Sequence, residues 1–355
     1  MRSSIAERLK AARKLKGYSL QDLAEALHGT LSRQALHKYE KGEVEPDTEK
    51  ILMLSIALGV KPEFFYRTSE VALGEIEFRK KTSLPTKEID RVKEITKDYL
   101  TRYLELENIM GIETEFKNPF DEDRNESYED ATKAAEKLRE AWKLGLDPIY
   151  NVAELLEDNH IKVVELEVNE DFDGLQTWVN RTIPVVAYNR VYLEKSDRIR
   201  FTLLHELCHL LLEKKLKGKT LRDKEKYCDQ FASAVLLPEE SLKAELGHHR
   251  VRVFIPELEK IKQQYGVSMQ AIVMRATDLG ILNPNFKLEF FKMFSRNGWR
   301  KNEPVDYDGQ EEATRFDQLV FRALAEDQIS MSKAAELKNQ RLAEFRRKYI
   351  LPGSL

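Results

Sequence analysis

The chain has 355 residues, of which 42% are hydrophobic and 34% are charged, and its formal net charge is −3. This length and apolar content predict two or three packed domains, and the balanced charge excludes a global nucleic-acid signal. Two cysteines argue against a disulfide framework and favour a reducing compartment. The N-terminus lacks a signal-peptide core, and no apolar run reaches about 18 residues. We therefore expect a cytoplasmic protein.

Residues 1–67 are predicted to form a series of short helices. An apolar stripe from Ile5 to Leu15 ends at Gly17, and Ser19 and Ser32 are placed to cap the next two helices. A helix, a short turn and a second short helix form the helix-turn-helix arrangement. Residues 1–41 also hold nine Lys and Arg against four acidic residues, so this segment is locally basic.

The pattern SxxxLAxxL from Ser19, followed by SRQALHKYEKG from Ser32, resembles the XRE/phage-repressor family across residues 5–66. The resemblance implies a five-helix, lambda-repressor-like domain whose third helix enters the major groove. Arg33 and Gln34 would then meet base edges, because Arg pairs with guanine and Gln with adenine. Lys38 would reach a base or a phosphate.

Three further lysines are expected to contact the DNA backbone: Lys14, Lys16 and Lys41. Domains of this kind usually bind inverted repeats as dimers, so we expect a double-stranded operator and a homodimer. The alternative is a helical domain that binds protein only, because the fold does not force DNA binding.

Residues 68–128 are predicted to be a helical connector and linker. Residues 74–81 alternate like a strand, and residues 86–110 form a helix with one apolar stripe. That stripe favours an intramolecular seam over dimer packing. The acidic, turn-rich segment 117–127 is expected to be an exposed linker.

Residues 129–285 are predicted to form one domain with a small sheet. Helices are expected at residues 131–144 and 148–158, and strands at residues 161–166, 174–179 and 183–188. The strand at 174–179 is a candidate to pair with an extended peptide, although a strand inside the sheet is the alternative.

The run FTLLHELCHLLLE beginning at Phe201 places two histidines around a glutamate in an apolar helix, for which Ser196 is the expected cap. His205 and His209 lie four residues apart and therefore leave the same helix face. Such a pair holds zinc in metallopeptidases, and Glu206 is then the catalytic residue that activates water.

Catalytic zinc takes three protein ligands and keeps an open position. Glu225 and Asp229 lie four apart on the next predicted helix and share a face. We assign Glu225 as the third ligand and Asp229 as the acceptor that fixes a ligand histidine's tautomer. The alternative is a solvated acidic face.

The motif HELCH followed by ExxCDxFAxxxLLP resembles the ImmA/IrrE metallopeptidases across roughly residues 148–285. The resemblance implies a zincin-like, mainly helical domain with a small sheet, zinc held by two histidines and a glutamate, and a glutamate general base. Zinc is the expected metal, with manganese as the alternative. The whole chain is therefore expected to be mainly α with a small β-sheet.

Further residues are candidates for roles in catalysis or redox control. Tyr188, His248 and His249 are candidates to donate a hydrogen bond to the oxyanion that forms during peptide hydrolysis. Cys208 and Cys228 are either a redox pair near the metal or small apolar residues in the helix interiors.

The remaining chain is predicted to be helical. Residues 256–279 resemble another helix-turn-helix, with Gly266 as the turn and Ser268 as the cap, for which packing on the peptidase domain is favoured over a second DNA contact. Residues 286–355 are expected to form C-terminal helices near 315–325 and 332–350.

The leading hypothesis is a DNA-binding regulator with a zinc-dependent peptidase site that cleaves a repressor-like protein, or itself, in stress or mobile-element control. One alternative is a regulator whose metal-binding domain senses a ligand without hydrolysis. Another is an antitoxin-like module that binds a toxin. The intact residues His205, Glu206, His209 and Glu225 favour the first hypothesis.

Overall fold

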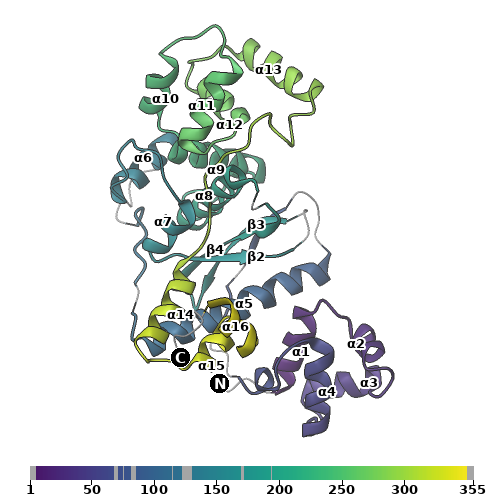
Figure 1. The fold of residues 1–355 in the computed structure, drawn as a ribbon. Helices are drawn as coiled ribbons and strands as arrows, with labels where there is room; N and C mark the ends of the chain where they lie inside the picture. Colours follow the sequence, from purple (N-terminus) through teal and green to yellow (C-terminus); the bar gives the residue numbers. More distant parts are fainter. Residues whose placement is uncertain are drawn as a thin grey trace. The chain divides into compact units, whose positions relative to one another are not determined.

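The computed structural model describes residues 5–67, 71–74, 76–80, 85–113, 115–121, 130–168, 172–192 and 194–349, with the backbone alone at 77–80. These residues are mainly helical with one small sheet, which confirms the expected fold class. They form two compact units, one of residues 1–73, 82–113 and 316–355 and one of residues 74–81 and 114–315 (Figure 1). None of the described helices is long and apolar enough to cross a membrane.

The first unit begins with a bundle of short helices. They are α1 (Ile5–Leu15), α2 (Leu20–Ala26), α3 (Arg33–Lys41), α4 (Thr48–Leu58) and the 3₁₀ helix η1 (Pro62–Tyr66). Ser19 and Ser32 accept hydrogen bonds from the backbone of Asp22 and Ala35, so both expected caps are confirmed. Leu23, Leu36 and other apolar residues fill the bundle core.

A charge pair fastens α3 to α1. The Arg13 guanidinium donates to both carboxylate oxygens of Glu40, at 2.6 and 2.8 Å, and also to the carbonyl of Tyr18. Both side chains are largely buried. The two-point contact fixes the angle at which α3 projects from the bundle.

Helices from distant parts of the chain complete this unit. They are α5 (Thr86–Ile109), α14 (Arg315–Ala325), α15 (Met331–Leu337) and α16 (Leu342–Tyr349). Tyr103 and Leu106 of α5 pack against α14 to α16, so the apolar stripe of α5 is an intramolecular seam. The expected single helix at 332–350 is instead two helices.

The second unit contains a four-stranded sheet in the order β1-β3-β4-β2. Its strands are β1 (Glu77–Lys80), β2 (Lys162–Leu166), β3 (Phe172–Val179) and β4 (Ile183–Asn189). Strand β2 runs parallel to β4, whereas β3 is antiparallel to both β4 and β1. Strand β3 has a neighbour on each side, so the alternative of a strand inside the sheet is confirmed.

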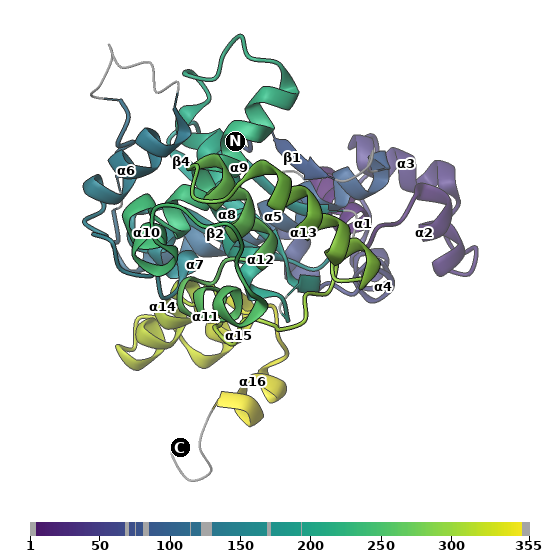
Figure 2. The same ribbon diagram turned by 90° about the horizontal axis from the view of Figure 1, so that it is seen from above.

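Helices cover this sheet and extend the unit. They are α6 (Ala131–Ala141), α7 (Val152–Asp158), the 3₁₀ helix η2 (Arg190–Tyr192), α8 (Ser196–Leu212), α9 (Leu221–Leu236), α10 (Glu239–Leu246), α11 (Ile255–Tyr265), α12 (Met269–Asp278) and α13 (Pro284–Arg296). Helix α8 packs on β3 and β4, and α9 lies beside α8 (Figures 1 and 2). Ser196 is the first residue of α8 and Lys195 precedes it, so the expected serine cap is wrong.

A buried ion pair anchors α8 in this unit. Arg200 and Glu311 have no exposed side-chain surface and meet at 2.6 Å. Glu311 also accepts the backbone N–H groups of Val152 and Ala153 at the start of α7. Gly266 packs so closely on Arg200 that a Cβ atom there would lie 2.5 Å from its Nε, which explains the need for glycine at this turn.

The helix-turn-helix-like segment at 256–279 belongs to the same core. Gly266 ends α11 with a left-handed conformation, and Ser268 caps α12, as expected. Leu258, Ile261 and Ile272 are buried in the core that α8 and α9 share. The described contacts therefore agree with a packing role for these helices.

Glu157, near the end of α7, is another buried carboxylate. It predicts that the free energy of unfolding depends on pH. Burial raises its pKa to about 7 from 4.5, although the backbone of Arg315 donates to it. The folded protein holds the proton on Glu157 more tightly than the unfolded chain does. The protonated Glu157 therefore stabilises the fold at low pH, and this stabilisation is lost as pH rises from about 5 to about 7. The full loss is about 3 kcal/mol.

Replacing Glu157 by Gln removes the charge and keeps an oxygen that can accept from Arg315. We expect the thermal midpoint of Glu157→Gln to change less than that of the parent between about pH 5 and pH 8, and to exceed it at about pH 8. Asp158→Asn, which changes an exposed neighbour on the chain, is the matched control. Parallel pH profiles for parent and Glu157→Gln would contradict this assignment.

Candidate metal centre

Helices α8 and α9 bring together three side chains that can ligate a metal: His205, His209 and Glu225. The two histidines leave α8 one turn apart, and Glu225 comes from the first half of α9. The apolar residues of α8 fix this helix in the core, and His205 is only 1% exposed. The structure thus unites residues that lie 20 positions apart in the sequence.

The three donors have the spacing that a tetrahedral ion requires. The Nε2 atoms of His205 and His209 lie 3.1 Å apart. Oε2 of Glu225 lies 3.3 Å from Nε2 of His205, and Oε1 lies 3.3 Å from Nε2 of His209. A tetrahedron with about 2.0–2.1 Å from centre to corner has edges of about 3.3–3.4 Å. This donor set therefore fits zinc.

Asp229 orients the first of these histidines. Its Oδ1 atom lies 2.8 Å from Nδ1 of His205, and it stands one turn after Glu225 on α9. A carboxylate at this position accepts the Nδ1 proton, which leaves the Nε2 lone pair directed at the other two donors. The contact agrees with a His205 tautomer that carries its proton on Nδ1.

Protons and a metal would compete for these groups. Burial opposes the charge on His209, but hydrogen bonds with Cys228 and Glu225 outweigh it and raise its pKa to about 10. Hydrogen bonds from His205 and His209 hold the pKa of Glu225 far below its ordinary value. A bound cation would replace the proton that holds the cluster together.

Glu206 lies on α8 between the two histidines and is 1% exposed. Its neighbour across the helix–sheet contact is Gly174 of β3, where a Cβ atom would lie 3.3 Å from Glu206 Cγ and 2.7 Å from Thr202 Cγ2. The absence of a side chain at Gly174 lets β3 approach this part of α8 closely. Strand β3 is therefore the strand beside Glu206.

Comparison with known families identifies two segments. Residues 9–65 match the helix-turn-helix family model, and residues 156–277 match the IrrE N-terminal-like domain. The chain thus joins a helix-turn-helix domain to an IrrE-like domain. The residues His205, Glu206, His209 and Glu225 all lie within the second match.

One curated relative resembles part of the chain. It is the SPbeta prophage-derived uncharacterized HTH-type transcriptional regulator YonR of Bacillus subtilis (strain 168), which is 44% identical over 61 residues. The match covers 17% of this chain and 55% of that protein, so it spans about half of the relative's length.

The helix-turn-helix domain presents its expected DNA-contacting residues on one side of α3. Arg33, Gln34 and Lys38 are exposed and, with His37, line a hollow of about 680 Å³. Leu36 and Tyr39 face the core from the same helix. The structure therefore brings the three candidates for base contact onto one surface.

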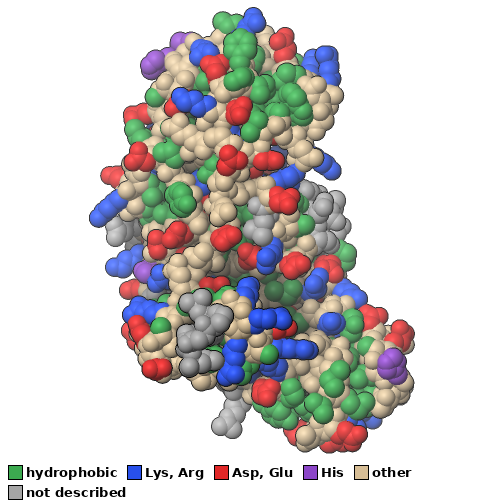
Figure 3. Space-filling view, in the orientation of Figure 1, with side chains coloured by type: hydrophobic (Ala, Val, Ile, Leu, Met, Phe, Trp, Pro, Cys, Tyr) green, Lys and Arg blue, Asp and Glu red, His purple; other side chains and the backbone are tan. Residues whose placement is uncertain are grey.

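The lysines expected to contact the backbone differ in their surroundings. Lys41 and Lys16 are exposed. Lys14 is only partly exposed and pairs with Asp90 of α5 at 3.1 Å, so a phosphate contact would have to compete with this pair. Acidic and basic side chains are interspersed over the face of the protein shown in Figure 3.

The three oxyanion candidates have different surroundings in the structure. Tyr188 is fully buried in β4, and its hydroxyl donates to Glu165 of β2 at 2.9 Å. Burial and this carboxylate raise the pKa of Tyr188 well above its ordinary value. His248 and His249 are exposed after α10, and His249 faces the carbonyl of Gly280.

The two cysteines form a contact that their sequence positions do not reveal. Cys208 and Cys228 are both buried with free thiols on adjacent helices. Burial raises the pKa of Cys208 well above its ordinary value, whereas a hydrogen bond from Cys208 lowers the pKa of Cys228 to about 6. Cys228 is also hydrogen-bonded to the imidazole of His209.

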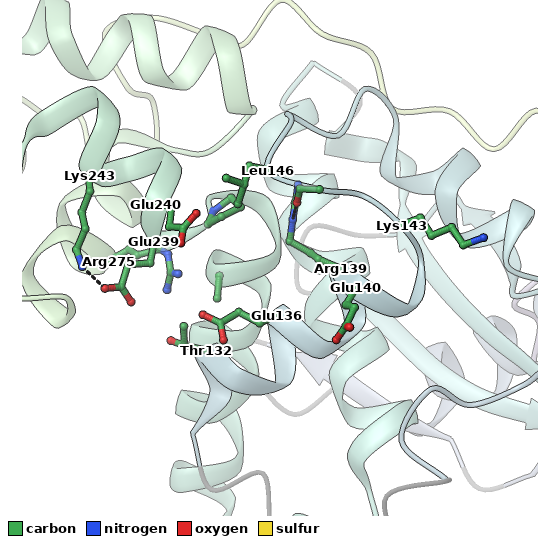
Figure 4. A pocket seen from close by; sticks show the side chains of 13 residues that line it. Thr132, Glu136, Arg139, Glu140, Lys143, Leu146, Glu239, Glu240, Lys243 and Arg275 are labelled. Atoms are coloured by element: carbon green, nitrogen blue, oxygen red, sulfur yellow. Dashed lines mark hydrogen bonds and ion pairs between the residues drawn. The ribbon is translucent and has the colours of Figure 1, made fainter.

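A separate cavity of about 660 Å³ lies among α6, α10 and α12 and is lined by both acidic and basic side chains (Figure 4). Two arginines in its wall, Arg139 and Arg275, were not identified from sequence. They donate to the carbonyls of Val235 and Leu237 at the C-terminal end of α9. Helix ends leave such carbonyls without intrahelical partners, so both arginines secure the helix that carries Glu225.

Proposed function

We propose that this chain is a DNA-binding regulator with a metal-dependent endopeptidase site, and that it cleaves a repressor-like regulatory protein or itself. The observation that carries this proposal is the mutual spacing of 3.1–3.3 Å among the donors of His205, His209 and Glu225. An HExxH helix with this third carboxylate suits a gluzincin-like peptidase.

The residues of the proposed centre have separate roles. His205, His209 and Glu225 would hold the ion, which is zinc or, alternatively, manganese, and Asp229 would keep His205 in the required tautomer. When bound, the ion would act as a Lewis acid toward water and the peptide carbonyl. The low exposure of His205 and His209 would keep competing solvent away from that position.

Glu206 would carry the proton. Its carboxylate would accept a proton as water attacks the peptide carbonyl and would then deliver it to the departing amine. This role needs a carboxylate on the ligand helix next to the substrate's path. Its place between the two ligand histidines and beside β3 supports that role.

The helix-turn-helix domain would direct the chain to a double-stranded operator, with α3 in the major groove and a homodimer matching an inverted repeat. In terms of chain order, residues 1–67 would form this domain, 68–128 the connector, 129–285 the peptidase domain and 286–355 the C-terminal helices. The exposure of Arg33, Gln34 and Lys38 on one helix face supports the DNA-binding role.

Changing the base-contacting face should remove specific DNA binding. With an operator selected from random duplexes, we expect Arg33→Ala/Gln34→Ala to bind at least about 30-fold more weakly, because each base contact contributes about 1–3 kcal/mol. Lys41→Gln should instead weaken binding to all duplexes equally and make the affinity less dependent on salt concentration. Unchanged affinity of the double variant in a titration would contradict this role for α3.

The peptidase proposal is tested by metal-dependent fragments. The purified chain is loaded with Zn²⁺ and incubated alone and with helix-turn-helix regulators encoded next to its gene, and the products are identified by mass spectrometry. We expect discrete fragments of one regulator or of the chain, and their loss with a chelator. Intact proteins throughout would favour the regulator or antitoxin alternatives.

A further inference from the structure

We propose that β1 occupies the position of a substrate strand and holds the peptide-binding edge of the sheet closed. The inference rests on the proposed peptidase function and names the element that regulates access to that site. A substrate would have to displace residues 76–80 before it could pair with β3.

The first observation is where β1 lies. It pairs with β3 along the edge that β4 leaves open, because the sheet order is β1-β3-β4-β2. The pairing is antiparallel and sets Glu77 opposite Gln176, Phe78 opposite Leu175 and Arg79 opposite Gly174. Just before the strand, the backbone N–H of Gly74 donates to the carbonyl of Trp178 at 2.7 Å.

Strand β3 lies beside the part of α8 that carries Glu206. Gly174 approaches Glu206 and Thr202 of α8 so closely that no side chain fits between them. The pairing of Arg79 with Gly174 therefore brings the backbone of β1 alongside the strand position nearest Glu206. This is the edge at which an extended peptide would lie within reach of the proposed catalytic carboxylate.

Strand β1 and a bound peptide could not pair with this edge of β3 at the same time. Each outward N–H and C=O group of β3 can pair with one strand at a time, so β1 and an added peptide compete for the same backbone groups. Strand β1 has only four residues and its register shifts between Arg79 and Lys80. Short, irregular edge strands are weakly held, so displacement is feasible.

Chain order makes this strand suitable for regulation. Residues 1–73 and 82–113 belong to the unit that holds the helix-turn-helix, so β1 is tethered to that unit at both ends. An event that pulls on either tether would favour release of the edge. The two chain connections of β1 would thus link the helix-turn-helix unit covalently to the edge of the sheet.

The test uses two proline variants that serve as each other's control. Neighbouring residues of an antiparallel strand point their N–H groups to opposite sides, so one of Phe78→Pro and Arg79→Pro removes a bond to β3 and the other does not. Binding of a labelled peptide with the sequence of residues 74–81 is measured on metal-free protein. We expect the variant that loses a hydrogen bond to β3 to bind the peptide about tenfold more tightly than the parent. The other variant should bind the peptide as the parent does.

A reversible lock provides a second arm in case a proline impairs folding. Glu77→Cys/Gln176→Cys places two thiols at paired positions of β1 and β3. The oxidised double variant should lose peptide binding at least about tenfold, and reductant should restore it, with Gln176→Cys alone as the control. Hydrogen exchange of the β3 amides should rise in the releasing proline variant and fall again with peptide.

Equal peptide affinity in the parent, both proline variants and the oxidised lock would overturn the proposal. Because peptide binding is measured without metal, it tests the closed edge even if no hydrolysis is detected. Conversely, hydrolysis at the same rate in the parent and the oxidised lock would reject the closed edge while the peptidase function stands.

Discussion

Glu206→Gln should lower the rate of peptide hydrolysis by about 10²–10⁴-fold while zinc binding stays within a few-fold of the parent. The amide has nearly the same size as the carboxylate, so the packing against Gly174 is kept. It cannot accept the proton of the attacking water, however, and a positioned general base contributes about 10²–10⁴-fold. The loss should appear in kcat rather than in KM.

Glu194→Gln is the matched control, because it makes the same chemical change at an exposed position just before α8. This control should hydrolyse the substrate at the parent rate. Activity of Glu206→Gln within about tenfold of the parent would assign the proton transfer to another group. Loss of zinc together with activity would instead place Glu206 among the residues that hold the site together.

Local signals made much of the first unit predictable. Ser19 and Ser32 cap their helices as expected because a cap depends on a side chain and a backbone N–H three residues later. The buried positions Leu23 and Leu36 follow from helical periodicity for the same reason. Such features need only a short stretch of chain to be recognised.

Long-range features were not predictable from one sequence. Helix α5 packs with α14 to α16, which lie more than 200 residues later, so the compact units do not follow chain order. The pairing of Arg200 with Glu311 likewise joins positions 111 residues apart, and neither residue has a local signal. The serine cap at Ser196 failed because α8 begins one residue earlier than a cap there would allow.

The candidate site shows the same division. The spacing of His205 and His209 on one helix predicted their common face, and the structure brings Glu225 and Asp229 beside these histidines. The hydroxyl of Tyr188 is hydrogen-bonded across the sheet to Glu165, a contact that depends on strand register and that the sequence alone does not reveal.

Substitutions of Glu225 and Asp229 should strongly weaken zinc binding. Glu225→Gln keeps the shape of the third donor but removes the negative charge that faces both imidazoles at 3.3 Å. A neutral amide is a much poorer zinc ligand, so we expect at least about 100-fold weaker binding. Asp229→Asn should weaken binding by about 10–100-fold, because it disturbs only the tautomer and orientation of His205.

The most direct measurement is zinc stoichiometry and affinity for the parent, Glu225→Gln, Asp229→Asn and the control Glu194→Gln, by elemental analysis and chelator competition. We predict one tightly held ion per chain in the parent and the control, partial loss in Asp229→Asn, and near-complete loss in Glu225→Gln. A parent chain that takes up no zinc, or a Glu225→Gln variant that binds it as tightly as the parent, would contradict the proposed metal centre.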